Sequence, residues 1–346
     1  MFLEIKKHIE KELLGYSRQI EQVYQLKRLS PILLNNIKEF LLRDGKRIRP
    51  ILFVIGYLGF KNKPAAGLYR SAISLELLHD FMLVHDDIID KSLTRRGKPA
   101  MHAQLNRYLR RERNIKFNGE DLAIVIGDVM YAMALDAYLA VRENPIRKEL
   151  SLKKLISAAL YTGSGEFIEL LLGSKSIELT SKEDIYKVYD YKTANYTFAS
   201  PLTMGALLAG AKDIEIDNLF KYGMSLGRAF QIKDDIIGLF GKSKKTGKSN
   251  LTDLKEARKT ILIWHAYNHS DKSGKTLIKN VFSGRKTENL ELNKIKKLII
   301  SAGSLNYAKS EIKKLLKKSK QTIKLTGLSK TYVKALTEFS AEILKV

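Results

Sequence analysis

Apolar residues recur at helical spacing along nearly all of this 346-residue chain. Clear examples are Ile73-Leu77-Leu78-Phe81, Leu122-Val125-Ile126-Val129 and Leu152-Leu155-Ile156-Ala159. Steps of three and four residues put such side chains on one face of an α-helix. Strict alternation of apolar and polar residues is scarce, so we expect no convincing β-sheet. The pattern predicts an all-α fold.

Short polar stretches with glycine, proline or asparagine separate the predicted helices. They lie at residues 59–67, 112–120 and 241–250 and at Asn144-Pro145. The segment Thr180-Ser181-Lys182-Glu183 has the form of a capping box that opens a helix. None of these breaks is long or distinct in composition, so we expect a single domain over residues 1–346.

The composition allows a sizeable core, since 45% of the residues are hydrophobic. The chain has no cysteine, which excludes disulfides, a thiolate nucleophile and a zinc–thiolate site. The first residues carry charges at helical spacing and do not resemble a signal sequence. No apolar run approaches the length that spans a bilayer. We therefore expect a cytoplasmic protein.

The formal net charge is +24, and much of the excess lies late in the chain, around residues 313–320. A lysine-rich, solvated helix face is the simplest interpretation. Contact with an anionic membrane surface stays open as an alternative. Nucleic acid is disfavoured, because the basic residues are not interleaved with aromatic residues that could stack on bases.

Two aspartate clusters stand out within apolar surroundings. They are His85-Asp86-Asp87-Ile88-Ile89-Asp90 and Gln231-Ile232-Lys233-Asp234-Asp235-Ile236-Ile237-Gly238. Adjacent carboxylates in such surroundings repel each other and need a cation to compensate them. On a helix, Asp86 and Asp90 lie one turn apart on the same face. Mg²⁺ fits, because it takes carboxylate oxygens on one side and substrate phosphates on the other.

Two basic segments complete the pattern. Arg95-Arg96-Gly97 follows the first aspartate cluster, and Gly45-Lys46-Arg47-Ile48-Arg49-Pro50 lies upstream of it. Arginine forks match phosphate oxygens with two parallel hydrogen bonds. Alone, either segment is weak evidence. Beside a metal cluster they indicate an enzyme that acts on diphosphates.

These motifs, followed by Lys192-Thr193 and Phe230-Gln231-x-x-Asp234-Asp235, occur in the order typical of one enzyme family. From residue 30 to residue 270 the chain resembles the trans-isoprenyl diphosphate synthases, the polyprenyl synthetase family, most closely its short-chain geranylgeranyl type. Further matches are Gly127-Asp128 and Gly165-Glu166-x-x-Glu169. The resemblance implies a single-domain helical bundle around a central apolar cavity. Lysine-rich helices over residues 271–346 lie beyond it.

The resemblance also implies roles for individual residues. Isopentenyl diphosphate would bind Lys46, Arg49, His79 and Arg96. Magnesium would bind Asp86, Asp90 and Asp234, with Asp87 and Asp235 in support. The allylic diphosphate would contact Arg95, Lys192, Lys248 and Arg258. Thr193 and Gln231 would lie beside the carbocation, so that Lys192, Thr193 and Gln231 form the catalytic set. Gly238 stands where the family often has a third aspartate, which puts the strength of the second metal site in question.

The implied reaction is a magnesium-dependent condensation of isopentenyl diphosphate with dimethylallyl, geranyl or farnesyl diphosphate. Its implied product is geranylgeranyl diphosphate, with farnesyl or longer chains as alternatives. Helical spacing puts Met82 and Leu78 in line below Asp86, where the growing tail would lie. In the family, a bulky aromatic five residues before the cluster limits growth, and Phe81 holds that place. Relatives also suggest a homodimer.

Three other interpretations stay open. A terpene cyclase would need one diphosphate site, and its usual second metal motif is not visible. A non-catalytic partner subunit would be expected to have lost aspartates or arginines, which are intact here. A basic protein that binds membrane or nucleic acid would make the aspartates incidental.

Overall fold

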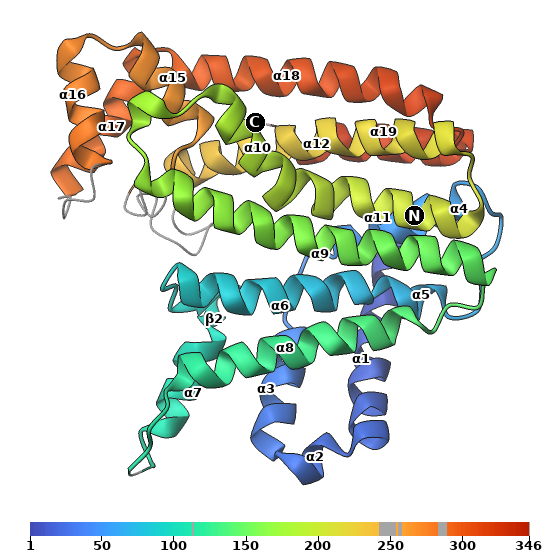
Figure 1. Ribbon diagram of the computed structural model, residues 1–346. Coiled ribbons are helices and arrows are strands. Elements are labelled where there is room, and N and C mark those ends of the chain that lie inside the picture. Colours follow the sequence, from blue (N-terminus) through green and yellow to red (C-terminus); the bar gives the residue numbers. More distant parts are fainter. Residues whose placement is uncertain (113, 242–253, 255–257, 283–288, 346) are drawn as a thin grey trace. The chain divides into compact units, whose positions relative to one another are not determined.

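The computed structural model describes residues 1–112, 114–241, 254, 258–282 and 289–345 (Figure 1). The chain divides into two compact units, Met1–Lys153 with Met204–Gly210, and Lys154–Thr203 with Ala211–Val346. Helices make up nearly all of the regular structure in the described residues, so the all-α prediction is confirmed. The expectation of a single domain stays a prediction.

The first unit contains α1 (Phe2–Tyr24), α2 (Leu26–Leu29), α3 (Pro31–Leu41), α4 (Ile48–Leu58), α5 (Leu68–Ala72), α6 (Ser74–Ile89), β1 (Thr94–Arg95), β2 (Lys98–Pro99), α7 (Met101–Leu109) and α8 (Gly119–Tyr138). Two helices, α9 (Pro145–Ser174) and α11 (Ser200–Ala209), run from one unit into the other along the chain.

The second unit contains η1 (Ile177–Leu179), α10 (Lys182–Val188), η2 (Tyr189–Ala199), α12 (Asp213–Phe240), α15 (Ile261–His269), α16 (Lys272–Val281), α17 (Asn289–Ser301), α18 (Ser304–Thr322), η3 (Ile323–Leu325) and α19 (Lys330–Ile343).

Helix α6 is central to the first unit. It packs lengthwise along α8 and also contacts α4, α5 and α7, and Figure 1 shows α6 and α8 side by side. Its apolar side chains, including Leu75, Leu77 and Val84, are completely buried. Burial of apolar side chains in its first three turns fixes α6 in the core. Its C-terminal end, which carries the first aspartate cluster, therefore has a fixed position.

A small antiparallel ribbon follows α6, and it corrects the expectation of no sheet. Thr94 pairs with Pro99 and Arg95 pairs with Lys98. Arg96 and Gly97 form the two-residue turn between the strands, with φ angles of 55° and 74°. Positive φ at both turn residues is the geometry that matches the twist of a two-stranded ribbon. Strands of two residues are too short to show alternation in the sequence.

The second unit is organised around α12, which packs against η2 and α18. Segment η2 is a π-helix, a wider and rarer winding that occurs mostly at functional sites. Gly223 and Gly227 lie one turn apart on α12, and an added methyl group would clash with Ala199 at the first and Ala194 at the second. These glycines let α12 approach the backbone of η2 closely.

Most predicted helix boundaries are confirmed. Helix α8 begins with a complete capping box of Asn118 and Asp121, and α9 begins at Pro145. The capping box predicted at Thr180 lies one residue later, because Ser181 is the N-cap and Asp184 its partner. The break predicted at residues 241–250 lies outside the described residues except for Gly241.

Helix α9 requires another correction. An 18-residue window of this helix has a mean hydropathy of 1.3, so by length and composition alone it could cross a bilayer. The expectation that no apolar stretch reaches this length was therefore wrong, because the few charges in α9 hid the stretch. Phe167 and Leu160 of this helix are 63% and 61% exposed.

Candidate active site

The three aspartates of the first cluster differ sharply in their surroundings. The side chain of Asp87 is completely buried, whereas that of Asp86 keeps 23% of its exposure and Asp90 is partly exposed. Arg95 donates from Nε to Asp87 at 2.8 Å and from Nη2 to Asp86 at 3.2 Å. Asp87 thus supports the loop after α6, while Asp86 and Asp90 stay accessible to a ligand.

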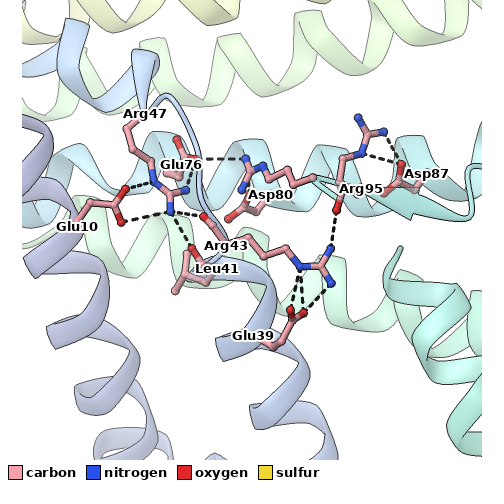
Figure 2. Close-up of polar contacts among 10 residues, drawn as sticks. Glu10, Glu39, Leu41, Arg43, Arg47, Glu76, Asp80, Asp87 and Arg95 are labelled. Carbon is pink, nitrogen blue, oxygen red and sulfur yellow. Dashed lines mark hydrogen bonds and ion pairs between the residues drawn. The ribbon is translucent and has the colours of Figure 1, made fainter. Parts of the chain in front are cut away.

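Arg95 itself is held by a second arginine (Figure 2). The buried guanidinium of Arg43 donates to the carbonyl oxygens of Arg95 at 3.3 Å and Pro99 at 2.9 Å. Glu39 fixes this guanidinium through three hydrogen bonds. Burial alone would lower the pKa of Arg95, but its bonds to Asp87 outweigh that effect and raise it. The ribbon is therefore anchored at its backbone and its cation stays charged.

A cluster of positive charge surrounds His79 of α6. Enclosure by the protein lowers the pKa of His79 well below 6.5, and the charges of Arg49, Arg96, Arg95 and Arg47 lower it further. His79 is therefore neutral at physiological pH and can donate one hydrogen bond from its ring. The predicted isopentenyl site residues Arg49, His79 and Arg96 are thus brought together, and Lys46 lies exposed on the loop before α4.

Arg47, which sequence reasoning left without a role, holds this loop in place. It donates to Glu10 at 2.9 Å and to Glu76 at 2.6 Å, and to the carbonyl oxygen of Arg43 at 2.6 Å. Its side chain is completely buried, and Figure 2 shows it between the two glutamates. The loop between α3 and α4 is thereby tied to α1 and α6, which fixes the starting points of Lys46 and Arg49.

A chain of hydrogen bonds connects the predicted catalytic residues of the second unit. Thr193 donates to Gln231 at 2.6 Å, and Gln231 donates to Asp235 at 2.9 Å. Tyr189 donates to the other oxygen of Asp235 and accepts from the backbone N–H of Ile261 at 3.0 Å. Burial and the charge of Asp235 raise the pKa of Tyr189 well above 10, so it remains a donor.

In the second cluster, as in the first, one aspartate is buried and hydrogen-bonded while another is accessible. Asp235 is 6% exposed and accepts bonds at both oxygens, whereas Asp234 is exposed on the surface of α12. Lys192 forms ion pairs with Glu166 and Glu169 of α9, at 2.5 Å for the former. Arg258 is partly exposed, and Lys248 lies outside the described residues.

The predicted chain-length residues occupy two kinds of position on α6. Leu78 is 1% exposed and belongs to the core, while Phe81 and Met82 are partly exposed. The Phe81 ring contacts His85 at 4.7 Å, edge to face, and Tyr131 of α8 at 5.3 Å. Phe81 is therefore flanked by two further rings rather than standing alone.

The accessible carboxylates fit magnesium. Asp86 and Asp90 offer hard oxygen donors one turn apart, and Asp234 offers another on α12. Among the described residues no three His, Cys, Asp or Glu side chains gather to hold a metal ion by themselves. In the usual Mg²⁺ site, a few carboxylates, waters and substrate phosphates share the ion.

Comparison with known proteins decides the family. The polyprenyl synthetase family matches residues 30–299. The chain belongs to the polyprenyl synthetase family. It is a trans-prenyltransferase that makes short-chain prenyl diphosphates.

Individual relatives agree with this assignment. The chain is 30% identical over 305 residues to a short chain isoprenyl diphosphate synthase of Methanocaldococcus jannaschii, covering 88% of this chain and 84% of the relative. It is 30% identical over 276 residues to a geranylgeranyl diphosphate synthase of Saccharolobus solfataricus, covering 78% and 76%. A crystal structure of geranylgeranyl pyrophosphate synthase from Corynebacterium glutamicum, complexed with isoprenyl diphosphate and magnesium, superposes with a TM-score of 0.89 at 25% identity, covering 99% and 98%.

Several residues that organise this polyprenyl synthetase chain escaped sequence reasoning: Arg43, Arg47, Glu76, Tyr131 and Tyr189. Arg47 lies inside a recognised basic motif, and only its position between Lys46 and Arg49 could have drawn attention to it. Tyr189 precedes Lys192 by three residues, but nothing in its spacing indicates a bond to Asp235. The family match also extends beyond residue 270, where the resemblance read from the sequence had ended.

Proposed function

We propose that the protein condenses isopentenyl diphosphate with an allylic diphosphate, in the presence of Mg²⁺, to give geranylgeranyl diphosphate. Farnesyl or longer products are the alternatives. The proposal draws on the magnesium and isoprenyl diphosphate named for the Corynebacterium glutamicum structure and on the product named for the Saccharolobus solfataricus relative.

One observation supports the proposal above others: a cationic cluster gathers beside the helix that carries the acidic pair. His79, around which Arg49, Arg96, Arg95 and Arg47 gather, precedes Asp86 by seven residues, which is about 10 Å along α6. A cationic site takes a bare diphosphate, whereas a carboxylate site takes a diphosphate that carries metal. Two diphosphates can therefore bind side by side without contact between their charges, as a condensation requires and a cyclase does not.

The roles of the residues follow from their chemistry. Arg49, Arg96, Lys46 and neutral His79 would bind the isopentenyl diphosphate. Asp86, Asp90 and Asp234 would hold magnesium, with Asp87 and Asp235 as supports. When bound, magnesium would neutralise the charge that develops on the departing diphosphate. The same diphosphate would accept hydrogen bonds from Arg95, Lys192, Arg258 and Lys248. A cation that already pairs with a carboxylate would then be shared between that carboxylate and the diphosphate.

The environment of the carbocation needs polarity without nucleophilicity. Thr193 donates its hydroxyl hydrogen bond to Gln231, which leaves the lone pairs of the hydroxyl oxygen as acceptors. Such oxygens stabilise a nearby cation electrostatically, because they are fixed before the reaction begins. A cation of this kind must also be shielded from water, which would otherwise capture it.

Purified protein incubated with isopentenyl diphosphate and each allylic primer tests the proposal. Diphosphate release and the mass of the prenyl product should both depend on Mg²⁺. Asp86→Asn, Asp90→Asn and Asp234→Asn should each lower kcat at least about a hundredfold, since transition-state charge stabilisation is lost. Asp217→Asn is the matched control on α12, because Asp217 is exposed and pairs with Lys221 one turn away on the surface.

Two results would contradict the proposal. If no primer yields a longer prenyl chain, the protein has no synthase activity, and the result would favour a non-catalytic role. A cyclic hydrocarbon formed from the allylic substrate alone would favour the cyclase instead.

We also propose that the protein is a homodimer. The proposal rests on apolar side chains that face solvent along α9, where Leu170 and Leu171 are 52% and 54% exposed, and along α8, where Val125 is 57% exposed. Exposed apolar faces of this kind mark interaction sites. Light scattering should give twice the chain mass, and Leu170→Lys with Leu171→Glu should yield monomers.

A peripheral membrane contact is a further proposal, with the cytoplasm as the compartment that supplies the charged, impermeant substrates. Lys313, Lys317 and Lys320 are exposed along α18, and Leu325, which follows this helix, is 64% exposed. Lysines near an anionic bilayer contribute about 1 kcal/mol each. Co-sedimentation with phosphatidylserine vesicles but not with phosphatidylcholine vesicles would support the contact, and salt should abolish it.

A further inference from the structure

Two buried carboxylates lie one helical turn apart on α6, beneath the cationic cluster. Glu76 is 2% exposed and Asp80 is completely buried. Both lie close to the guanidinium of Arg96, since Nη2 is 3.5 Å from Oε1 of Glu76 and 3.4 Å from Oδ1 of Asp80. Buried charges cost free energy unless they are paired, so this placement calls for a role.

The guanidinium of Arg96 is held on one edge only. Its Nη2 faces the two carboxylates, while Nη1 is buried and has no hydrogen-bond partner among the residues that the structure describes. Neither oxygen of Asp80 has a hydrogen-bond partner within this described part either. A buried donor left without an acceptor is costly. An anion that binds at Nη1 would remove this cost.

Glu76 connects the two basic segments of the site. Its Oε1 accepts from Arg47 at 2.6 Å and also lies 3.5 Å from Nη2 of Arg96. Arg47 and Arg96 also share an unusual backbone, with φ angles of 51° and 55°. L-residues rarely adopt this left-handed region, and where they do the surroundings must compensate. A shared carboxylate supplies such compensation for both loops.

We propose that Glu76 and Asp80 are positioning residues, which fix Arg96 by its Nη2 edge so that Nη1 is directed to the diphosphate of the bound homoallylic substrate. This inference rests on the proposed function, in which that diphosphate is that of isopentenyl diphosphate.

The charge of Asp80 adjusts how strongly Arg96 binds its ligand. Burial and the charge of Glu76 raise the pKa of Asp80 well above 3.8, while Arg96, Arg47 and Arg49 oppose the shift. A protonated Asp80 leaves most of the positive charge of Arg96 to the incoming diphosphate. An ionised Asp80 would compete with that diphosphate for the same cation.

Steady-state kinetics with each substrate varied in turn test the proposal. Asp80→Ala removes the carboxyl group that lies 3.4 Å from Nη2 and should raise KM for isopentenyl diphosphate about tenfold, as expected when a charged group loses a polar partner. KM for the allylic substrate should change less than about twofold, because the allylic site depends on other residues. Asp80→Asn keeps an acceptor oxygen of the same shape and should restore most of the affinity.

Controls separate positioning from simple stabilisation. Glu12→Gln weakens an ion pair of 2.9 Å with Arg70 in the same unit, so it should lower the melting temperature without changing either KM. If Asp80→Ala does not fold, Asp80→Val, which fills the space but offers no acceptor, replaces it. Equal changes in both KM values, or no recovery in Asp80→Asn, would overturn the proposal.

Arg96→Gln distinguishes this inference from the function on which it rests. If Arg96→Gln leaves KM for isopentenyl diphosphate unchanged, the assignment of Arg96 to that site is wrong. If Arg96→Gln raises this KM and Asp80→Ala does not, the site stands and the positioning role of Asp80 is wrong.

Discussion

Replacing Tyr189 with phenylalanine should destabilise the second unit through a single hydroxyl group. The hydroxyl donates to Asp235 and accepts from the N–H of Ile261 at 3.0 Å. All three residues are buried, so water cannot replace either bond. Loss of a bond to a carboxylate costs about 2 kcal/mol, and a buried N–H left without a partner costs about 1 kcal/mol more. We therefore expect about 3 kcal/mol of lost stability.

Calorimetry or circular dichroism measures this loss. At about 2 °C for each kcal/mol in a chain of this size, the melting temperature should fall by about 6 °C. The raised pKa of Tyr189 keeps it protonated, so the fall should be the same between pH 6 and pH 9. kcat should also decrease, because Asp235, which accepts a hydrogen bond from Gln231, would lose the second donor that fixes its position.

Tyr191→Phe is the matched control. Tyr191 lies two residues further along η2 and contacts Tyr161 through its ring, which the substitution retains. Its effect should stay within about 0.5 kcal/mol. If Tyr189→Phe has the melting temperature of the wild type, or if both variants lose the same free energy of unfolding, the hydrogen bonds of Tyr189 do not stabilise the second unit as we propose.

Three further predictions concern the product, the packing and the pH dependence. Phe81→Ala should lengthen the prenyl product seen by mass spectrometry, and an unchanged product distribution would count against Phe81 as the floor. Gly227→Ala should lower kcat and the melting temperature, because its methyl group would push against Ala194. Gly163→Ala on α9 meets nothing within 4 Å and, because alanine favours a helix, should not lower the melting temperature. Burial alone would raise the pKa of Glu311, but bonds from Lys314, Tyr186 and Lys182 lower it to about 2. A depressed carboxylate pKa stabilises the fold above about pH 4.5, so the wild type should lose this contribution between pH 4.5 and pH 2 and approach the stability of Glu311→Gln there.

The helical periodicity predicted most of the fold because the apolar face of a helix repeats in sequence wherever it repeats in space. Helix α6 illustrates this, since it buries Leu77 and Leu78 of the periodic set. Finer boundaries escaped, as at Thr180 and Ser181, because both residues can cap a helix and both have an acidic residue three positions later. The ribbon at Thr94–Arg95 was too short for any pattern.

The candidate site was predictable where chemistry shows in spacing, as with Asp86 and Asp90, and not where it depends on distant partners. Arg47 is buried because Glu10, which lies 37 residues away, meets it. Similarly, Asp235 depends on Tyr189, 46 residues earlier in the chain. No local pattern separates such an anchoring arginine or tyrosine from one that is exposed, since the difference lies in the tertiary contact.

The π-helical winding of η2 has an evolutionary consequence. Within eleven residues it presents Tyr189 and Thr193 to Asp235 and Gln231 of α12, and Lys192 to Glu166 of α9. Losing one residue here would tighten the coil and rotate everything downstream by about 100°, the angle that separates neighbours in an α-helix. Descendants of this gene should therefore exchange amino acids in this stretch but keep its length, whereas insertions and deletions should be found elsewhere.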